Sequence, residues 1–365
     1  MSPTATILEP YIPPPQTNED LNWATLSVLD LSLLSKPGGK EALAKQVLSF
    51  IDEHGFFYVT NHGLTSTQIN RQYAIAQALF SLPLSEKLKY LSNTAAGDFR
   101  GYKPQSTGKL GVHDNDERYN IPKFTREHEE GRAHPQVIWD HYDEIRELSL
   151  HIHHKVLLPL LRLFAFILEL EDEDALVNRH RYEEPGLEYL RYMVYHPRSE
   201  AEDLEAGNLW AKGHTDYNTL TFLFHQPIAG LQVLGPDGNW RYVRSDDPSK
   251  LIVNVADALE YLSGGFLKST VHRVVRPPKD QVALDRYSLI YFARPEASVK
   301  MTPLESPLIQ RVGVSLDEKY VRALQGVTAE EWARARIAKD HRLRTGVVDK
   351  AEREIIAGVP QKYYD

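Results

Sequence analysis

The feature of this sequence that most constrains its fold is a series of short strand-like segments in its second half. From about residue 188 onward, hydrophobic and polar residues alternate with a period of two, and turns such as Pro236-Asp237-Gly238-Asn239 separate the segments. This alternation predicts strands with one buried face, because successive side chains of a strand point to opposite faces of a sheet. The predicted strands span residues 190–195, 220–224, 231–234, 240–243, 251–255, 270–275 and 288–292. Several short strands at this spacing favour a β-sandwich or barrel.

The first half of the chain shows helical periodicity instead. Apolar residues three and four positions apart predict helices over residues 39–54 and 66–80, and a longer helix is predicted over 135–170. Short strands are expected at 26–31 and 56–60, and a polar loop at 94–124. We therefore predict an α+β fold with a mainly β core, in which a helical N-terminal layer covers a jelly-roll barrel.

These changes along the chain also predict its domain organisation. Residues 1–22 are rich in proline and polar residues and are expected to form an extended arm. Residues 23–180 form the helical N-terminal region, 181–300 the jelly-roll core and 301–365 a C-terminal helical extension. In that extension, Thr328-Ala329-Glu330-Glu331 is a capping box that predicts a helix ending near Arg344. Its thin apolar face suits the outside of the barrel or a flap near its mouth.

Composition excludes several classes of protein. The chain has no cysteine, which excludes disulfides, thiolate metal sites and cysteine nucleophiles. A formal net charge of −8 without a basic stripe argues against nucleic-acid binding. The longest apolar run, residues 156–168, contains Pro159 and Arg162 and is too short to span a bilayer. Because the N-terminus lacks the pattern of a signal peptide, we expect a cytoplasmic protein that does not bind membranes.

A histidine and a carboxylate lie close together in the stretch KGHTDYNTLTFLF. On extended backbone His214 and Asp216 point to the same side, so both can reach one metal ion. His272 lies downstream in a predicted strand and supplies a third ligand. Two imidazoles and one carboxylate leave three positions of an octahedral ion open, as in non-haem Fe(II) oxygenases. A rival cluster, His151-x-His153-His154, has no acidic residue at matching spacing and is expected to be solvated.

A second pair, Arg286 and Ser288, follows on the next predicted strand. The two residues are an i, i+2 pair, so a guanidinium and a hydroxyl face the same direction. Together they make a receptor for a carboxylate, because the guanidinium forms charge-assisted, fork-like hydrogen bonds. The pair alone has no specificity, but after the three candidate metal ligands it adds an anion anchor to the site.

The order of these motifs resembles a known enzyme family. HTD at 214–216, STVHRVV at 269–275 and RYS at 286–288 resemble the iron- and 2-oxoglutarate-dependent oxygenases of the isopenicillin-N-synthase-like family. The similarity extends over roughly residues 26–295 and includes LDLS, HGFFYVTNHG, LPLSEK, GLQV and VNVADALE. It implies a distorted double-stranded β-helix and an enzyme that uses Fe(II), 2-oxoglutarate and O2. Such an enzyme hydroxylates, desaturates or rearranges a small molecule of specialised metabolism and releases succinate and CO2.

The resemblance also implies a role for each matching residue. The implied Fe(II) ligands are His214, Asp216 and His272. Arg286 and Ser288 would bind the distal carboxylate of 2-oxoglutarate, and Tyr195 matches a tyrosine that contacts the same carboxylate in many relatives. The asparagine and first tyrosine of the family's Asn-Tyr-Tyr-Pro strand are replaced here by Met193 and Val194.

Substrate contacts are expected near the pocket mouth. The candidate residues are Arg100, Tyr102, Lys103, Arg118, Phe292 and Arg294. Phe292 falls where relatives often stack an aromatic residue against the substrate, so an aromatic or polycyclic small molecule is the first expectation. A nucleobase or an amino-acid derivative is the second.

Three other functions are compatible with the motifs. An oxidase or synthase of the same fold could use Fe(II) and O2 without 2-oxoglutarate, and its Arg-x-Ser pair would then hold a substrate carboxylate. A ligand-binding protein could retain the barrel without turnover. A zinc hydrolase could use the same three metal ligands.

Overall fold

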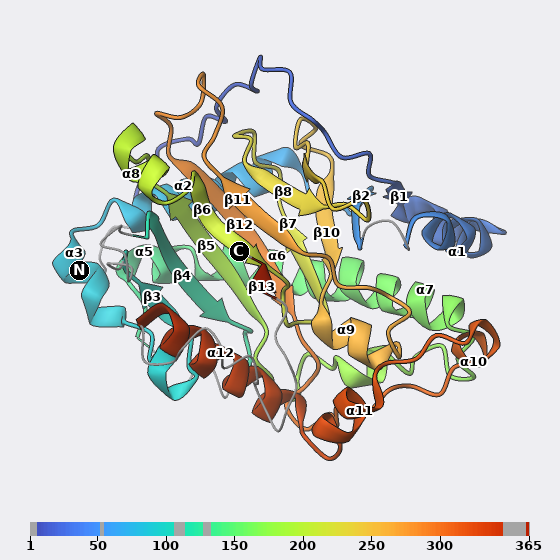
Figure 1. The fold of residues 1–365 in the computed structure, drawn as a ribbon. Helices are drawn as coiled ribbons and strands as arrows, with labels where there is room; N and C mark the ends of the chain where they lie inside the picture. The colour runs from blue at the N-terminus through green and yellow to red at the C-terminus, as the bar shows by residue number, and fades with distance from the viewer. Residues whose placement is uncertain (1–5, 52–54, 106–113, 127–132, 346–362, 365) are drawn as a thin grey trace.

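Two facing β-sheets form the centre of the protein in a computed structural model that describes residues 6–51, 55–105, 114–126, 133–345 and 363–364 (Figure 1). The larger sheet has eight strands in the order β1-β2-β10-β7-β12-β5-β4-β3, and the smaller has five in the order β13-β6-β11-β8-β9. The strands are β1 Val28–Asp30, β2 Phe56–Thr60, β3 Gly101–Lys103, β4 Asp116–Pro122, β5 Tyr189–Tyr195, β6 Leu209–His214, β7 Leu220–Leu223, β8 Leu231–Leu234, β9 Trp240–Tyr242, β10 Leu251–Val255, β11 His272–Val275, β12 Arg286–Ala293 and β13 Tyr363–Tyr364. This arrangement confirms the predicted mainly β core of jelly-roll type.

Helices cover the outer face of the larger sheet and close one end of the barrel (Figure 1). They are α1 Gly39–Phe50, α2 Ser66–Phe80, α3 Leu84–Lys87, α5 Gln136–Asp140, α6 Tyr142–His151, α7 Leu158–Ile167, α8 Glu200–Glu205, α9 Asp257–Leu262, α10 Pro307–Val312, α11 Glu318–Leu324 and α12 Ala329–Thr345. Helix α2 contacts β5 and β12, and α1 packs on α7. Their apolar faces and the outer face of the sheet form one large hydrophobic core. The predicted helical N-terminal layer is confirmed.

The long helix predicted over residues 135–170 is divided in the structure. Helix α5 ends at Asp140, and the non-helical backbone of His141 separates it from α6. From Tyr142 to Ile167 the helix is continuous through a π-helical segment at residues 152–157. This stretch is long and apolar enough to cross a membrane by length and composition, but more than half of its most apolar window is buried inside the protein. A buried core helix of a protein without a membrane span meets the same test.

Side chains of β5 and β12 alternate between the helical side of the sheet and the barrel interior. Tyr192 faces the helices, where its hydroxyl donates a hydrogen bond to Gln72 of α2. The neighbouring positions on β5 therefore face the opposite way, into the space between the two sheets. In the register of the two strands, Tyr195 lies opposite Arg286 and Arg191 lies opposite Ile290. Both strands thus present alternate side chains to the barrel interior.

The region predicted as a polar loop at 94–124 contains two strands, β3 and β4. The prediction was wrong there because the polar residues of β4 face the barrel interior instead of bulk solvent. Tyr119 and Ile121 occupy the alternate positions and belong to the hydrophobic core. Strand β6 was expected only as extended backbone at His214 and Asp216, and it ends at His214. Asp216 therefore follows the strand, whereas we expected it to continue the strand.

The C-terminal helix lies over the barrel mouth. Helix α12 begins with the predicted capping box, in which the Thr328 hydroxyl accepts from Glu331 N at 3.1 Å and Glu331 accepts from Thr328 N at 2.8 Å. Ala333 and Ile337 of this helix pack with Phe292 in one hydrophobic cluster. The sequence allowed this helix to lie on the outside of the barrel or to form a flap near its mouth, and in the structure it forms the flap.

Candidate active site

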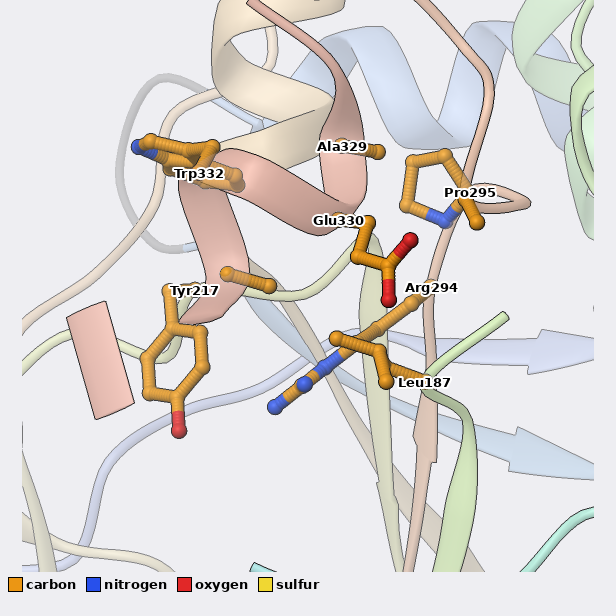
Figure 2. A pocket seen from close by; sticks show the side chains of 9 residues that line it. Leu187, Tyr217, Arg294, Pro295, Ala329, Glu330 and Trp332 are labelled. Atoms are coloured by element: carbon orange, nitrogen blue, oxygen red, sulfur yellow. The ribbon is translucent and has the colours of Figure 1, made fainter. Parts of the chain in front are cut away.

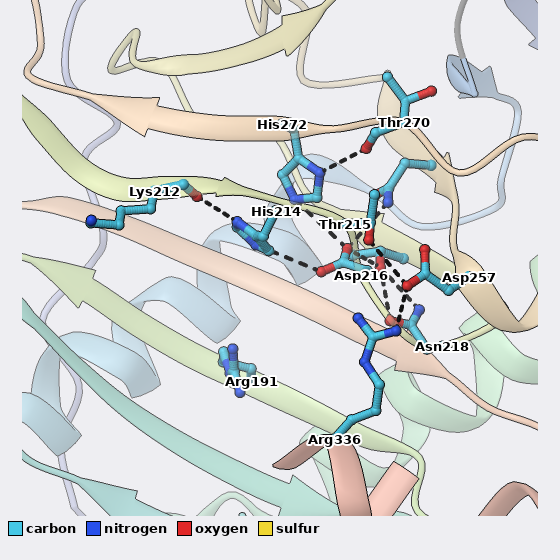
Figure 3. Close-up of polar contacts among 12 residues, drawn as sticks. Arg191, Lys212, His214, Thr215, Asp216, Asn218, Asp257, Thr270, His272 and Arg336 are labelled. Carbon is cyan, nitrogen blue, oxygen red and sulfur yellow. Dashed lines mark hydrogen bonds and ion pairs between the residues drawn. The ribbon is translucent and has the colours of Figure 1, made fainter. Parts of the chain in front are cut away.

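The three candidate metal ligands meet on the inner face of the smaller sheet (Figure 3). His214 ends β6 and His272 begins β11, and the two residues are paired in register. One ligand atom from each of His214, Asp216 and His272 lies within 4.8 Å of the other two. Each imidazole Nε2 is 3.9 Å from an oxygen of Asp216. Among the described residues this is the only cluster of histidine and acidic side chains close enough to hold a metal ion.

Backbone contacts orient both imidazoles toward the carboxylate. Nδ1 of His214 lies 2.7 Å from the carbonyl oxygen of Lys212, and Nδ1 of His272 lies 3.3 Å from that of Thr270. A carbonyl can only accept, so each Nδ1 carries the proton and each Nε2 presents its lone pair. Figure 3 shows both contacts as dashed lines. This is the tautomer that a metal bound at Nε2 requires.

Asp216 is held by two neutral donors. Its Oδ2 accepts from the Thr221 hydroxyl at 2.6 Å and from Asn254 Nδ2 at 3.1 Å. Burial raises the pKa of Asp216, but the positive charge of the two imidazoles when they are protonated, together with these two hydrogen bonds, outweighs burial, so that the pKa lies below its usual value. One ionised carboxylate and two imidazoles that direct Nε2 toward it form a donor set that fits Fe(II).

Across the interior, Arg286 is a buried cation whose contacts are all neutral. Its side chain is about 4% exposed, its Nη1 donates to the Ser288 hydroxyl at 3.2 Å and its Nε to the carbonyl of Ile228 at 3.3 Å. The ring of Tyr195 lies 5.7 Å from the guanidinium carbon. No carboxylate within the described part of the chain forms an ion pair with Arg286. A buried charge without a counterion is costly, so this position fits a ligand carboxylate. We call His214, Asp216 and His272 the triad. The region formed by the triad, Arg286 and Ser288 is called the metal end.

A charged cluster ties the strands together next to the metal end. His196, which follows β5, contacts Asp285 at 2.9 Å and Glu117 of β4 at 2.8 Å. These two carboxylates raise the pKa of His196 to about 9. Burial raises the pKa of Glu117, but hydrogen bonds from His196, Lys87 and Tyr102 lower it to about 2. Both groups are charged at neutral pH and hold β4, β5 and the start of β12 together.

Three of the predicted substrate cations are already neutralised. Arg100 pairs with Asp98 at 2.6 Å, Lys103 with Asp114 at 3.2 Å, and Arg118 with Asp116. Tyr102 lies on the face of β3 that points away from the interior, where it is 1% exposed and donates to a buried carboxylate. Tyr102 therefore has no surface in the barrel interior that a substrate could contact.

The other two predicted residues are Phe292, near the end of β12, and Arg294, which directly follows that strand. Phe292 stacks on Tyr189 with ring centroids 4.7 Å apart. Arg294 is 3% exposed and is surrounded by the rings of Phe99, Tyr189 and Tyr217. Figure 2 shows it in a small crevice beneath α12, next to Glu330 and Leu187. The crevice has room for roughly one water molecule, which is too little for a substrate.

Sequence reasoning missed two arginines at the mouth, a region we define by Arg191, Phe292 and α12. Arg191 of β5 lies inside the barrel, on the same side of the triad as Arg336 in Figure 3. Arg336 of α12 is 3% exposed and its Nη1 bonds Asp257 Oδ2 at 2.6 Å. That same oxygen accepts from Thr215, which lies between two candidate metal ligands, at 3.0 Å. Period-two alternation from Tyr195 could have placed Arg191 inside, but no local pattern pairs Arg336 with Asp257.

The rival histidine cluster has other partners. Nε2 of His151 lies 2.7 Å from the carbonyl of His62. His153 is fully buried and contacts Glu188 at 3.0 Å. The expectation that these histidines are solvated was therefore wrong for His153, which belongs to a buried polar network on the helical side of the sheet.

Two family models match the chain in consecutive segments. Residues 26–141 match the N-terminal region of non-haem dioxygenases in morphine synthesis, and residues 173–295 match the 2OG-Fe(II) oxygenase superfamily. The chain belongs to the 2-oxoglutarate- and Fe(II)-dependent oxygenases. The oxygenase is 32% identical to the 2-oxoglutarate-dependent dioxygenase frbH of Dothideomycetidae sp., over 76% of this chain and 84% of that protein. It is 28% identical to leucoanthocyanidin dioxygenase 1 of Oryza sativa subsp. indica, over 82% and 79%.

Solved structures show the same fold. A full-length Neurospora crassa protein, solved in complex with alpha-KG, which is 2-oxoglutarate, superimposes with a TM-score of 0.71 at 25% identity. The match covers 88% of this chain and 98% of that one. The oxygenase thus has the double-stranded β-helix that the resemblance implied, and it uses Fe(II), 2-oxoglutarate and O2 to oxidise a small molecule.

Proposed function

We propose that the metal end binds Fe(II) and 2-oxoglutarate through the residues that the motifs indicated. The proposed metal ligands are His214, Asp216 and His272, and the proposed 2-oxoglutarate contacts are Arg286, Ser288 and Tyr195. The observation that carries this proposal is the buried Arg286, which has only neutral contacts and lies on the sheet opposite the metal cluster. A dicarboxylate bound to the metal by one end would place its other carboxylate on this guanidinium.

The protein's own residues position the reactants and exclude water. Fe(II), 2-oxoglutarate and O2 together supply the oxidising chemistry. The carbonyls of Lys212 and Thr270 fix the imidazoles, and Thr221 with Asn254 leaves the second oxygen of Asp216 available. Tyr195, Met193, Trp210 and Val274 form a hydrophobic cluster between the sheets, which keeps water away from the Arg286 end.

The substrate is proposed to be a flat aromatic or polycyclic molecule. The stacked rings of Phe292 and Tyr189 offer an aromatic surface inside the mouth, against which a planar ring can pack. Ala333 and Ile337 of α12 extend this apolar surface. A second structure of the Neurospora crassa protein contains 5-formyluracil, which supports a planar ligand in this fold.

The test uses apo-protein under argon. Fe(II) followed by 2-oxoglutarate should produce a visible metal-to-ligand charge-transfer band, and the His214→Ala variant should not. With substrate and O2, succinate and product should form in equal amounts, and the product should gain one oxygen or lose two hydrogens. A wild-type protein that shows no band under these conditions would refute the proposal.

A further inference from the structure

We propose that Arg191 binds an anionic group of the substrate, so that the substrate is an aromatic carboxylate. This inference rests on the proposed function, because it places the substrate between the metal end and the mouth. It concerns a residue that none of the sequence motifs contains.

The contacts of Arg191 hold its guanidinium in place without neutralising its charge. Its Nε donates to Asn120 Oδ1 at 2.8 Å, and its Nη2 donates to the Tyr189 hydroxyl at 3.2 Å. Its guanidinium carbon lies 4.9 Å from the centroid of the Phe292 ring. No carboxylate among the described residues forms an ion pair with it. Arginine stays protonated in proteins, so Arg191 brings an uncompensated positive charge into the barrel.

Neighbouring basic residues differ from Arg191 in this respect. Arg118 and Lys103 lie near it on β4 and β3, but both pair with Asp116. Arg336 pairs with Asp257. Arg294 also lacks an ion pair among the described residues, but its guanidinium is enclosed by three aromatic rings and is only 3% exposed. Arg191 therefore combines an uncompensated charge with access to the interior.

The position of Arg191 allows a ligand to reach it. Arg191 lies on the inward-facing side of β5, opposite in direction to Tyr192, and its side chain is only partly buried, so part of its surface stays accessible. Ile290, opposite it on β12, is also partly buried, as are His214 and Asp216 of the metal cluster. These four residues therefore keep accessible surface along the part of the barrel that runs from the metal end to the mouth. In Figure 3 no contact joins Arg191 to the other residues drawn.

The unused donors indicate what Arg191 would bind. A guanidinium has five N–H donors, and two of them are used internally, which leaves three, including donors on both terminal nitrogens. The edge of the guanidinium formed by Nη1 and Nη2 matches the two oxygens of a carboxylate in a bidentate geometry. Because Asn120 and the two rings already fix the side chain, little conformational entropy is lost on binding. A ring attached to the carboxylate would lie against Phe292.

The experiment compares aromatic acids with amides of the same shape. Under argon, enzyme loaded with Fe(II) and 2-oxoglutarate is titrated calorimetrically with benzoate, 1-naphthoate, benzamide, 1-naphthamide and thymine. We expect at least one acid to bind about 10-fold or more tightly than its amide, because a charge-assisted bond is roughly twice as strong as a neutral one. Arg191→Met should weaken acid binding about 10- to 100-fold and change amide binding less than about 3-fold. Arg191→Lys should retain part of the preference.

Arg294→Met is the matched control, because it removes one positive charge from the same end of the barrel behind the ring of Tyr189. It should keep the acid preference of the wild type. Amides or thymine that bind as tightly as the acids, an unchanged preference in Arg191→Met, or no acid binding up to about 10 mM would each overturn the proposal. The charge-transfer band separates the two proposals. If Arg191→Met keeps the band, the metal end is intact, whereas a wild type without the band fails the proposed function whatever it binds at Arg191.

Discussion

The metal end and the mouth lie in the same barrel, but they are built from different kinds of contact. At the metal end, each candidate ligand is fixed by a partner that is close in sequence or on an adjacent strand, such as the carbonyl two residues before each histidine. At the mouth, Arg191, Phe292 and Arg336 come from two strands and a C-terminal helix. This difference suggests that the reaction chemistry depends on local backbone geometry, whereas substrate choice depends on long-range packing that can change without altering the metal end.

Removal of a metal ligand should have the largest effect and should act at the metal end. Asp216→Ala should lower Fe(II) affinity by more than the roughly 10- to 100-fold that loss of a surrounding hydrogen bond costs a metal site, and should abolish turnover. Iron content after dialysis and succinate release measure the two effects. Asp237→Ala, in an exposed turn, is the control and should retain iron. An Asp216→Ala protein that still holds one equivalent of iron would show that the cluster is not the metal site.

A second change separates the co-substrate from the metal. Arg286→Met should weaken 2-oxoglutarate binding by about 1.5–3 kcal/mol, or roughly 10- to 150-fold, because a carboxylate loses a charge-assisted bond in a buried pocket. Fe(II) binding should change by less than about 3-fold. Calorimetric titration of each ligand under argon provides both values. Equal losses for the metal and for 2-oxoglutarate would contradict the assigned role.

A third change tests the link between α12 and the metal end. Arg336→Met leaves Asp257 without its buried partner, so the free energy of unfolding should fall by about 1–3 kcal/mol. Arg334→Met on the same helix removes only a partly exposed pair with Glu330 and should cost less than about 0.5 kcal/mol. Urea denaturation of both variants gives the comparison. If the two variants lose the same stability, the Arg336–Asp257 pair does not anchor the helix.

The smallest expected effect concerns pH. His196 has a pKa raised to about 9, mainly by Asp285 and Glu117, so its charged form stabilises the folded state. That contribution is complete below about pH 6.5, the usual value for histidine, and disappears as the pH rises through 9. Because this group is partly exposed, the free energy of unfolding of the wild type should exceed that of His196→Gln by about 2 kcal/mol or less at pH 6. Urea denaturation at several pH values should show this difference shrinking toward pH 9.5. A gap that stays constant over this range would exclude the proposed titration.

The contrast between short-range contacts at the metal end and long-range contacts at the mouth also explains which features could be predicted from the sequence. The helix at 66–80 was predicted with its observed bounds, because its apolar residues repeat at helical spacing. The triad and Arg286 were indicated because each motif is short and their order matches a family pattern. Strand β4 was missed because its inward-facing residues are polar, as a ligand-binding interior allows. The Arg336–Asp257 pair could not be predicted, since it depends on how the last helix packs across the barrel.

The positions of Arg336 and Asp257 in the sequence determine when their contact can form during synthesis. The ribosome produces the chain from its N-terminus, and domains generally fold in that direction. All three candidate metal ligands and Arg286 emerge before Arg336, which lies fifty residues beyond Arg286 in the sequence. A nascent chain can therefore assemble the metal end while the mouth is still open. A premature stop shortly after residue 300 would remove the helix that covers the mouth and spare every residue assigned to the chemistry.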